Sequence, residues 1–358
     1  MSQPSVTHPT CIGIDLGDSH SHLFVLDLAS GEVLEEGRIP CTPAAFRRRF
    51  AGQPPARIAI EVGCHSPWVS RLLAEAGHEV VVANTRKLRL IYENDSKSDR
   101  VDAQYLARLA AADPQLLHPV RHRGAKAQAD RAVLVARDQA VQCRTRLVNC
   151  VRGLVKSLGH RLPKCDPEGF HNRVRETIPA ELLPAVEPLL DVLAILQQKI
   201  RALDKVIERL CQEQYSETAR LRQIKGVGPV SALNFVLTLE DPTRFTKSRT
   251  VGSYLGLRPG RKSSGRGDPE LHITKAGDTM LRRHLVNCAQ YILGPFGEDS
   301  DLRRWGLKLA GHGAKSAKKR AIIAVARKLA VLLHRLWLSG ATYEPLRNSR
   351  EPAHATAQ

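Results

Sequence analysis

The chain has 358 residues and a formal net charge of +18, because 54 lysines and arginines outnumber 36 aspartates and glutamates. A single core seldom grows past about 250 residues, so the length predicts two or three domains. The positive charge favours a polyanionic partner, either nucleic acid or an anionic membrane surface. The longest apolar runs carry charges and are too short to span a bilayer. This excludes a membrane protein and makes nucleic acid the expected partner.

The N-terminus has no basic segment followed by an apolar one, so we expect no signal peptide and a cytoplasmic location. Eight cysteines are scattered along the chain without a CxxC pair. This pattern predicts reduced, mostly buried thiols rather than a metal or disulfide framework. We expect the two ends, 1–9 and 348–358, to be disordered.

Residues 10–123 alternate strand and helix patterns and form the first expected domain. Apolar stretches separated by turn residues predict an antiparallel meander of strands at 11–17, 22–28 and 32–40. The pattern then predicts, in chain order, a short helix near 43–51, a buried strand at 57–62, a helix at 66–77, a strand at 79–84 and a helix at 99–112. This order is that of the α/β ribonuclease-H-like fold.

Residues 124–215 form a second, helical region. Its apolar residues recur at three-and-four spacing with charges between them, which predicts a long helical hairpin or coiled coil. The predicted apolar stripe consists of Leu189, Val192, Leu196, Leu203, Ile207 and Leu210. Core packing explains such a stripe by itself, and partner recognition or dimerisation is an additional hypothesis. The third expected domain, 216–345, is mainly helical and basic.

Four acidic residues stand at the ends of predicted elements in the first domain. Asp15 ends the first strand, Glu61 ends the fourth, and Asp99 and Asp102 share one face of the last helix at its first turn. If the first and fourth strands are neighbours, these carboxylates meet at one edge of the sheet, and such oxygen ligands suit a hard cation such as Mg²⁺. Taken singly, Asp15 could cap a turn, Glu61 could pair with an arginine and Asp99 could cap its helix. The expected convergence favours the metal site.

The segment IKGVGPVSA, residues 224–232, has the glycine spacing of a helix-hairpin-helix turn. In such a turn, Gly226 and Gly228 expose backbone N–H groups at a helix N-terminus to a DNA phosphate. The alternative is a turn whose glycines only permit close packing.

The segment RPGRKSSGRG, residues 258–267, combines four cations with two hydroxyl side chains. The candidate phosphate contacts of this part of the chain are Arg258, Arg261, Lys262, Arg266 and, further along, Lys275. A serine beside guanidinium groups could attack a phosphodiester, because the positive charge stabilises the alkoxide and the phosphorane. On the residues alone, a basic loop that only clamps phosphates is the favoured interpretation.

Six motifs between about residues 10 and 345 resemble, in order and separation, those of the DEDD transposases of bacterial insertion sequences. The motifs are GIDLGDSHSHLFVLD, AIEVGCHSPW, KSDRVDAQYLARL, IKGVGPVSA, YLGLRPGRKSSG and ITKAGDTMLRRHL. The resemblance implies a RuvC-like N-terminal domain and a C-terminal transposase domain. It also implies that Mg²⁺, or Mn²⁺ as a substitute, is bound by Asp15, Glu61, Asp99 and Asp102.

The resemblance further implies a serine nucleophile, which is Ser264, the serine before glycine, with Ser263 as the alternative. Strand exchange in such enzymes passes through a covalent phosphoserine link. It occurs in a homo-oligomer, a dimer or tetramer, whose composite sites join the acids of one protomer to the serine of another. Some members are guided by an RNA encoded beside the transposase, which pairs with donor and target DNA. We therefore expect DNA and a guide RNA as partners.

Other functions fit parts of the pattern. A site-specific DNA invertase of the same family would use the same residues, whereas a metal-only, junction-resolving nuclease needs the acids but no serine. A sugar-kinase or actin type of ATPase shares GIDLG, but the sequence has no second Asp-Gly phosphate loop and its charge is unusual for a small-molecule kinase. In a nucleic-acid-binding protein without catalysis, four converging acids would repel DNA unless they held a cation.

Overall fold

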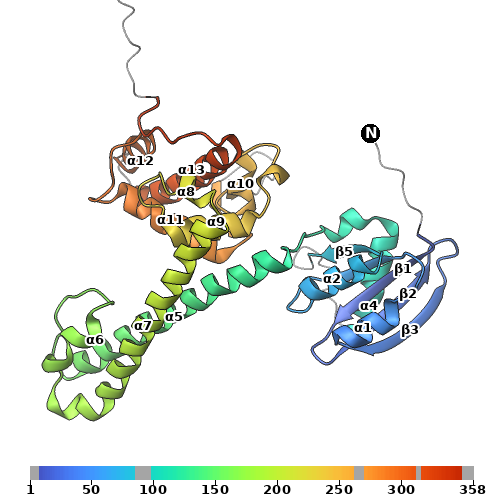
Figure 1. Ribbon diagram of the computed structural model, residues 1–358, viewed down its shortest axis with the longest axis horizontal. Helices are drawn as coiled ribbons and strands as arrows, with labels where there is room; N and C mark the ends of the chain where they lie inside the picture. The colour runs from blue at the N-terminus through green and yellow to red at the C-terminus, as the bar shows by residue number, and fades with distance from the viewer. Residues whose placement is uncertain (1–7, 85–97, 262–269, 312–315, 349–358) are drawn as a thin grey trace, which may run out of the picture. The chain divides into compact units, whose positions relative to one another are not determined.

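The computed structural model describes residues 8–84, 98–261, 270–311 and 316–348. The chain divides into two compact units, 1–123 and 124–358 (Figure 1). Most of the terminal residues for which the sequence predicts disorder, 1–7 and 349–358, lie outside the described ranges.

The first unit is built on a five-stranded sheet. Its strands, in spatial order, are β3 (Val33–Pro40), β2 (His20–Asp27), β1 (Thr10–Leu16), β4 (Arg57–Glu61) and β5 (Glu79–Ala83). The first three strands pair antiparallel, whereas β4 pairs parallel with both β1 and β5. The predicted meander is therefore confirmed, and the first and fourth strands are neighbours, which is the condition for the expected meeting of the acids.

Helices cover both faces of this sheet. Helices α1 (Pro43–Phe50) and α2 (Ser66–Glu75) pack on one face, where the core contains Ile12, Ile14, Ile58, Ile60, Phe46, Phe50 and Val69. Helix α4 (Asp99–Ala112) and the short 3₁₀ helix η2 (Pro114–Leu117) pack on the other, with Cys11, Ala59, Val81, Leu106, Ala110 and Leu117. Because side chains alternate along a strand, the even residues of β1 and β4 face α1 and α2, and the odd residues face α4.

Gly13 allows α4 to lie directly on β1. A Cβ atom at this position would stand 2.0 Å from the carbonyl oxygen of Ala103, so no larger residue fits without moving the helix. Two residues earlier on the same face of the strand, the Cys11 thiol donates to the carbonyl of Ala107 at 3.3 Å. β1 and α4 therefore run in opposite directions, and the first turn of α4 lies at the C-terminal end of β1.

The second unit begins with the two long helices α5 (Ala125–Ser157) and α7 (Leu183–Glu213), which form the predicted hairpin (Figure 1). Short elements join them: α6 (Phe170–Arg173), η3 (Arg175–Thr177) and η4 (Ala180–Leu182). The predicted apolar stripe on α7 is wrong at Val192, whereas Leu189 packs against the core of the hairpin. Leu190, Leu193 and Ile200 are buried, whereas Val192 is 43% exposed. Leucine or valine occupies both 189 and 190 and both 192 and 193, so spacing alone could not select the buried face.

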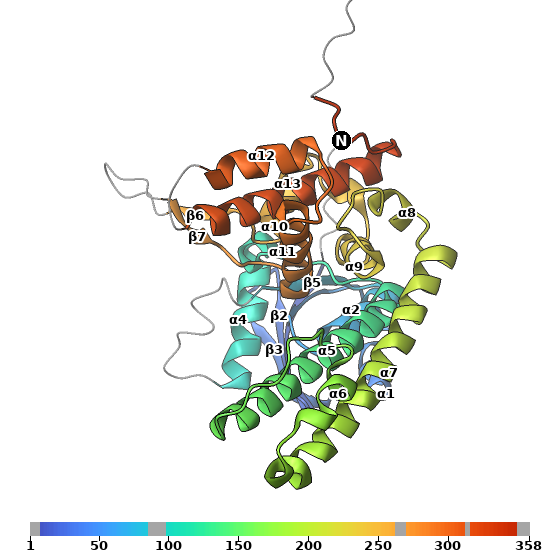
Figure 2. The same cartoon turned by 90° about the vertical axis from the view of Figure 1, so that its left-hand side faces the viewer.

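The rest of the second unit is a helical bundle around the C-terminal helix. Its elements are α8 (Thr218–Leu221), α9 (Pro229–Leu239), η5 (Pro242–Arg244), α10 (Arg249–Tyr254), β6 (Pro259–Arg261), β7 (Glu270–Ile273), α11 (Thr279–Leu293), α12 (Asp301–Gly311) and α13 (Ala317–Ser339). Figure 2 shows the β6–β7 hairpin at the edge of this bundle. One apolar cluster joins α5 and α7 to the bundle through Leu134, Ile207, Leu233, Leu237 and Met280. The helical region and the C-terminal region thus share a core.

The eight cysteines are free thiols, as expected, but Cys64, Cys143 and Cys150 are exposed, so the expected burial is wrong for these three.

No helix within the described ranges is long and apolar enough to cross a membrane.

Candidate active site

Two acids stand side by side at the ends of parallel strands. The register pairs Ile14 of β1 with Ile60 of β4, so the next residues, Asp15 and Glu61, are neighbours across the two strands. Both are odd-numbered residues and therefore lie on the sheet face that α4 covers. Both are partly buried.

The first turn of α4 supplies the other two acids. Ser98 is the N-cap, since its hydroxyl accepts the N–H of Val101 at 3.4 Å. The alternative that Asp99 caps the helix is therefore wrong. Asp102 is only 4% exposed, whereas the side chain of Asp99 is 66% exposed. The N-terminal end of a helix carries a partial positive charge, which stabilises carboxylates placed there.

The packing of α4 on β1 brings these acids to one edge of the sheet. Asp15 and Glu61 end their strands on the α4 face, and the first turn of α4 lies at that end of β1. Within the described ranges, however, no three His, Cys, Asp or Glu side chains close around a point as metal ligands do. The elements converge, while the side chains do not form a closed cage.

The donors at this edge suit a hard cation. All four are carboxylates, and Asp102 is buried where a cation would offset the cost of holding a negative charge away from water. Asp15, Glu61, Asp99 and Asp102 are the residues that would hold such an ion.

Two basic residues that were not predicted as site residues lie beside the acids. His22 is the register partner of Asp15, and Arg38 is the register partner of His22, so both lie on the same sheet face as the acids. Both residues belong to the predicted meander. A pairing register for its strands would have aligned them with Asp15 and so predicted their place beside the acids.

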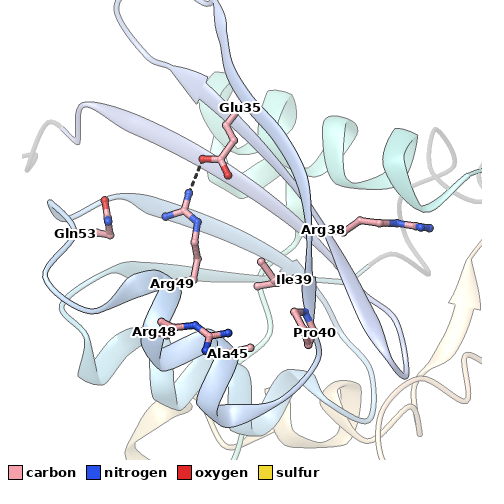
Figure 3. Close-up of a pocket in the computed structure, with 8 residues that line it drawn as sticks. All are labelled: Glu35, Arg38, Ile39, Pro40, Ala45, Arg48, Arg49 and Gln53. Carbon is pink, nitrogen blue, oxygen red and sulfur yellow. Dashed lines mark hydrogen bonds and ion pairs between the residues drawn. The ribbon is translucent and has the colours of Figure 1, made fainter.

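A basic hollow on the opposite face of the sheet takes no part in this site. It lies between β3 and α1, and Figure 3 shows Arg48, Arg49 and Glu35 along it. Arg49 donates to Glu35 at 2.6 Å. Arg48 and Arg49 lie on α1, away from α4 and the acids, whereas Arg38 reaches the rim of the hollow from β3 and points away from both of them (Figure 3).

The two glycines of the predicted hairpin turn differ in their surroundings. Gly226 has a φ of +98°, and a Cβ there would stand 2.8 Å from Cδ1 of Tyr291. Close packing on α11 therefore accounts for Gly226. Gly228 precedes α9 as its N-cap, and a Cβ there would meet no atom within 4 Å. Of the two, only Gly228 leaves room for a phosphate beside the helix N-terminus.

The basic serine segment is anchored at the β6–β7 hairpin. Ser263, Ser264, Lys262 and Arg266 lie outside the described residues. Arg261 ends β6, while Arg258 and Lys275 are exposed at the base of the hairpin. At this base, a Cβ on Gly256 would stand 2.2 Å from the carbonyl oxygen of Ala276, and Gly256 has a φ of +68°. The two chain segments that lead into the hairpin therefore touch backbone to backbone.

Comparison with known proteins places this arrangement among enzymes that act on DNA. A family model of IS110-type DEDD transposases, described as "Transposase", matches residues 12–159. A second, described as "Transposase IS116/IS110/IS902 family", matches residues 218–298. The transposase for insertion sequence element IS1328 of Yersinia enterocolitica is 30% identical over 291 residues, which cover 78% of this chain and 83% of that protein. The transposase for element IS1111A of Coxiella burnetii is 28% identical over 258 residues, 70% of each chain.

These matches define an insertion-sequence transposase, an enzyme whose substrate is DNA. The chain belongs to the IS110 family of transposases. A DEDD domain of this type generally implies the use of a divalent metal.

Proposed function

We propose that the protein is an Mg²⁺-dependent DNA recombinase that moves its insertion sequence through a serine nucleophile, guided by an element-encoded RNA. The observation that carries this proposal is the placement of Asp15 and Glu61 on adjacent strand ends beside the buried Asp102. The strand order β3-β2-β1-β4-β5, antiparallel and then parallel, supports a ribonuclease-H-like, RuvC-like assignment of the first unit.

In this proposal the two parts of the chain have separate roles. Asp15, Glu61, Asp99 and Asp102 hold the ion, Mg²⁺ or Mn²⁺, which when bound stabilises negative charge on the phosphoryl oxygens. The hydroxyl of Ser264 loses its proton and forms a bond to phosphorus, while the bond from phosphorus to one sugar oxygen breaks and that oxygen takes up a proton. Arg258, Arg261, Lys262, Arg266 and Lys275, with the backbone at Gly228, bind nearby phosphates.

The resemblance to the family also supports the partners. A guide RNA would pair with donor and target DNA, so the protein would not need to read the sequence itself. A homo-oligomer, a dimer or tetramer, would combine the acids of one protomer with Ser264 of another. The cytoplasm is the expected location.

A denaturing-gel assay for a covalent protein–DNA complex tests the proposal. Purified protein, the RNA transcribed from the flanking DNA, Mg²⁺ and a labelled element-junction DNA should give a shifted band. We expect the band to disappear in Ser264→Ala and in Asp102→Asn and to persist in Ser263→Ala, the matched control. Cut DNA without any adduct in the wild type would instead establish a metal-only nuclease.

A further inference from the structure

We propose that Arg38, oriented by His22, binds the phosphate of the DNA strand that is cut. This inference rests on the proposed function of the acids. The guanidinium of Arg38 would be a positive charge that the chain itself places beside the acids. Its position defines the side of the acid cluster on which the DNA backbone lies.

The register places these residues in one row across four strands. Ile14 pairs with Ile60, which sets Asp15 beside Glu61. Asp15 then pairs with His22, and His22 pairs with Arg38. Neighbouring strands are about 4.8 Å apart, so the backbone of Arg38 lies about 10 Å from that of Asp15, within reach of one long side chain and one phosphate. Two acids form one end of the row and two basic residues form the other.

Two ion pairs on β3 establish which face Arg38 occupies. Glu36, two residues before Arg38, pairs with Arg100 of α4 at 2.6 Å. Glu35 pairs with Arg49 of α1 at 2.6 Å. Even residues of β3 therefore face α4, and Figure 3 shows Arg38 pointing away from Arg48 and Arg49. Arg38 is on the face of the acids.

The hydrogen bond between Arg38 and His22 leaves most of the guanidinium available. Nε of Arg38 donates to Nε2 of His22 at 2.9 Å, so the two terminal nitrogens remain to bind an anion. Arg38 is exposed and, within the described ranges, it forms no ion pair with a carboxylate. His22 is only 16% exposed on its side chain, and its Nε2 lies 3.8 Å from Oδ2 of Asp99. The imidazole thus stands between the guanidinium and the nearest acid.

This arrangement suits a phosphodiester at the end of the row. A guanidinium binds two phosphate oxygens through parallel N–H groups, and such charge-assisted bonds are stronger than neutral ones. A phosphate held by Arg38 would lie between this cation and the ion held by the acids. Both positive charges would then stabilise the charge that develops on the phosphoryl oxygens.

The salt dependence of DNA binding tests the assignment without any cleavage step. The probe is a labelled duplex that carries the element junction, bound to the full chain in EDTA. Each neutralised phosphate contributes about 0.9 to the slope of log K against log salt. We expect Arg38→Gln to lower this slope by about 0.9 and Arg38→Lys to preserve it. Arg48→Gln, an exposed arginine on the opposite face, is the matched control and should leave the slope unchanged.

Two further readouts separate this inference from the proposed function. Arg38→Gln should reduce the rate of DNA cutting about 100-fold, whereas Mn²⁺ binding, measured by electron paramagnetic resonance, should equal that of the wild type.

His22→Leu should slow cutting without changing the slope, and His22→Gln, whose oxygen can accept from Arg38, should restore the rate. An unchanged slope in Arg38→Gln, or an equal loss in Arg48→Gln, would overturn the inference. Failure of the wild type to bind Mn²⁺ would count against the acids and not against Arg38.

Discussion

At the scale of single residues, Asp102 differs from the other three acids in its burial. Its carboxylate is 4% exposed at the start of α4, while Asp99, one turn earlier, points into solvent. Burial of a carboxylate is costly unless positive charge or hydrogen bonds offset it. The helix N-terminus supplies part of that positive charge, and a bound cation would supply more.

Asp102→Asn should therefore separate catalysis from stability. The amide keeps the shape of the side chain but is a far weaker metal ligand, so Mn²⁺ affinity should fall. The rate of DNA cutting should fall on the order of 1000-fold, because loss of a metal-bound charge costs several kcal/mol in the transition state. The melting temperature without metal should not decrease. Glu75→Gln, an exposed carboxylate at the end of α2, is the control for charge and should leave all three measurements unchanged. Normal cutting by Asp102→Asn would remove Asp102 from the site.

His284 makes the stability of the second unit depend on pH. Burial lowers its pKa to about 4, and Asn234 donates to its Nδ1 at 3.0 Å, which favours the neutral ring. The unfolded chain takes up this proton near pH 6.5, before the folded chain does. The contribution of His284 is thus fully present above pH 6.5 and is lost as the pH falls toward 4. The loss is roughly 3 kcal/mol.

Urea unfolding of the wild type and of His284→Gln between pH 7 and pH 4 measures this contribution. Glutamine can still accept from Asn234 but does not titrate, so its stability should decline less by about that amount. Parallel curves for the two proteins would contradict the assignment.

At the scale of elements, the contact between β1 and α4 aligns the acids. Gly13 permits backbone-to-backbone contact with Ala103, and the Cys11 thiol bonds to the carbonyl of Ala107. These contacts fix how far the first turn of the helix extends beyond the end of the strand. The acids of β1 and α4 are therefore positioned relative to each other by contacts made at other residues of the same two elements.

Gly13→Ala should disturb both stability and the site. The added methyl group would stand 2.0 Å from a carbonyl oxygen of α4, so the helix must shift. We expect a loss of about 3 kcal/mol in the free energy of unfolding, together with weaker Mn²⁺ binding. Gly63→Ala is the matched control, because a Cβ there meets no atom within 4 Å. Equal stability of the two variants, measured by urea unfolding, would disprove the close contact.

The sequence predicted most of the first unit, since its strands and helices begin with clear turn and cap residues. The helix at 99–112 was predicted with the bounds of α4. The buried face of α7 was predicted only in part, because apolar side chains occur on more than one face of that helix. His22 and Arg38 were missed for another reason: each is an ordinary polar residue in a strand, and only the pairing register relates them to Asp15.

At the scale of the whole molecule, the chain is two units joined at one peptide bond. The carbonyl of Arg123 accepts from Arg71 in the first unit at 3.3 Å, while the N–H of Gly124 donates to Glu240 in the second at 2.8 Å. Among the described residues, each apolar cluster lies wholly within one unit. Each unit therefore has its own core.

Separate cores predict separate unfolding. A fragment of residues 1–123 should fold alone and bind Mn²⁺ as the full chain does, because the four acids all belong to it. The full chain should unfold in two calorimetric transitions, one of which coincides with that of the fragment. A single transition, with an unfolded fragment, would show that the units stabilise each other.

The buried thiol of Cys11 has a practical consequence for observing the enzyme. Cys11 is 0% exposed and burial raises the pKa of its thiol to about 11, so an alkylating reagent reaches it only when α4 leaves the strand. Once Cys64, Cys143 and Cys150, which are exposed, have been changed to serine, slow alkylation of Cys11 would report how often the helix lifts from β1. A cation that ties Asp102 to Asp15 would make such openings rarer, in proportion to its occupancy. The rate of alkylation, followed by mass spectrometry, would thus measure metal binding through a residue of the strand on which α4 packs.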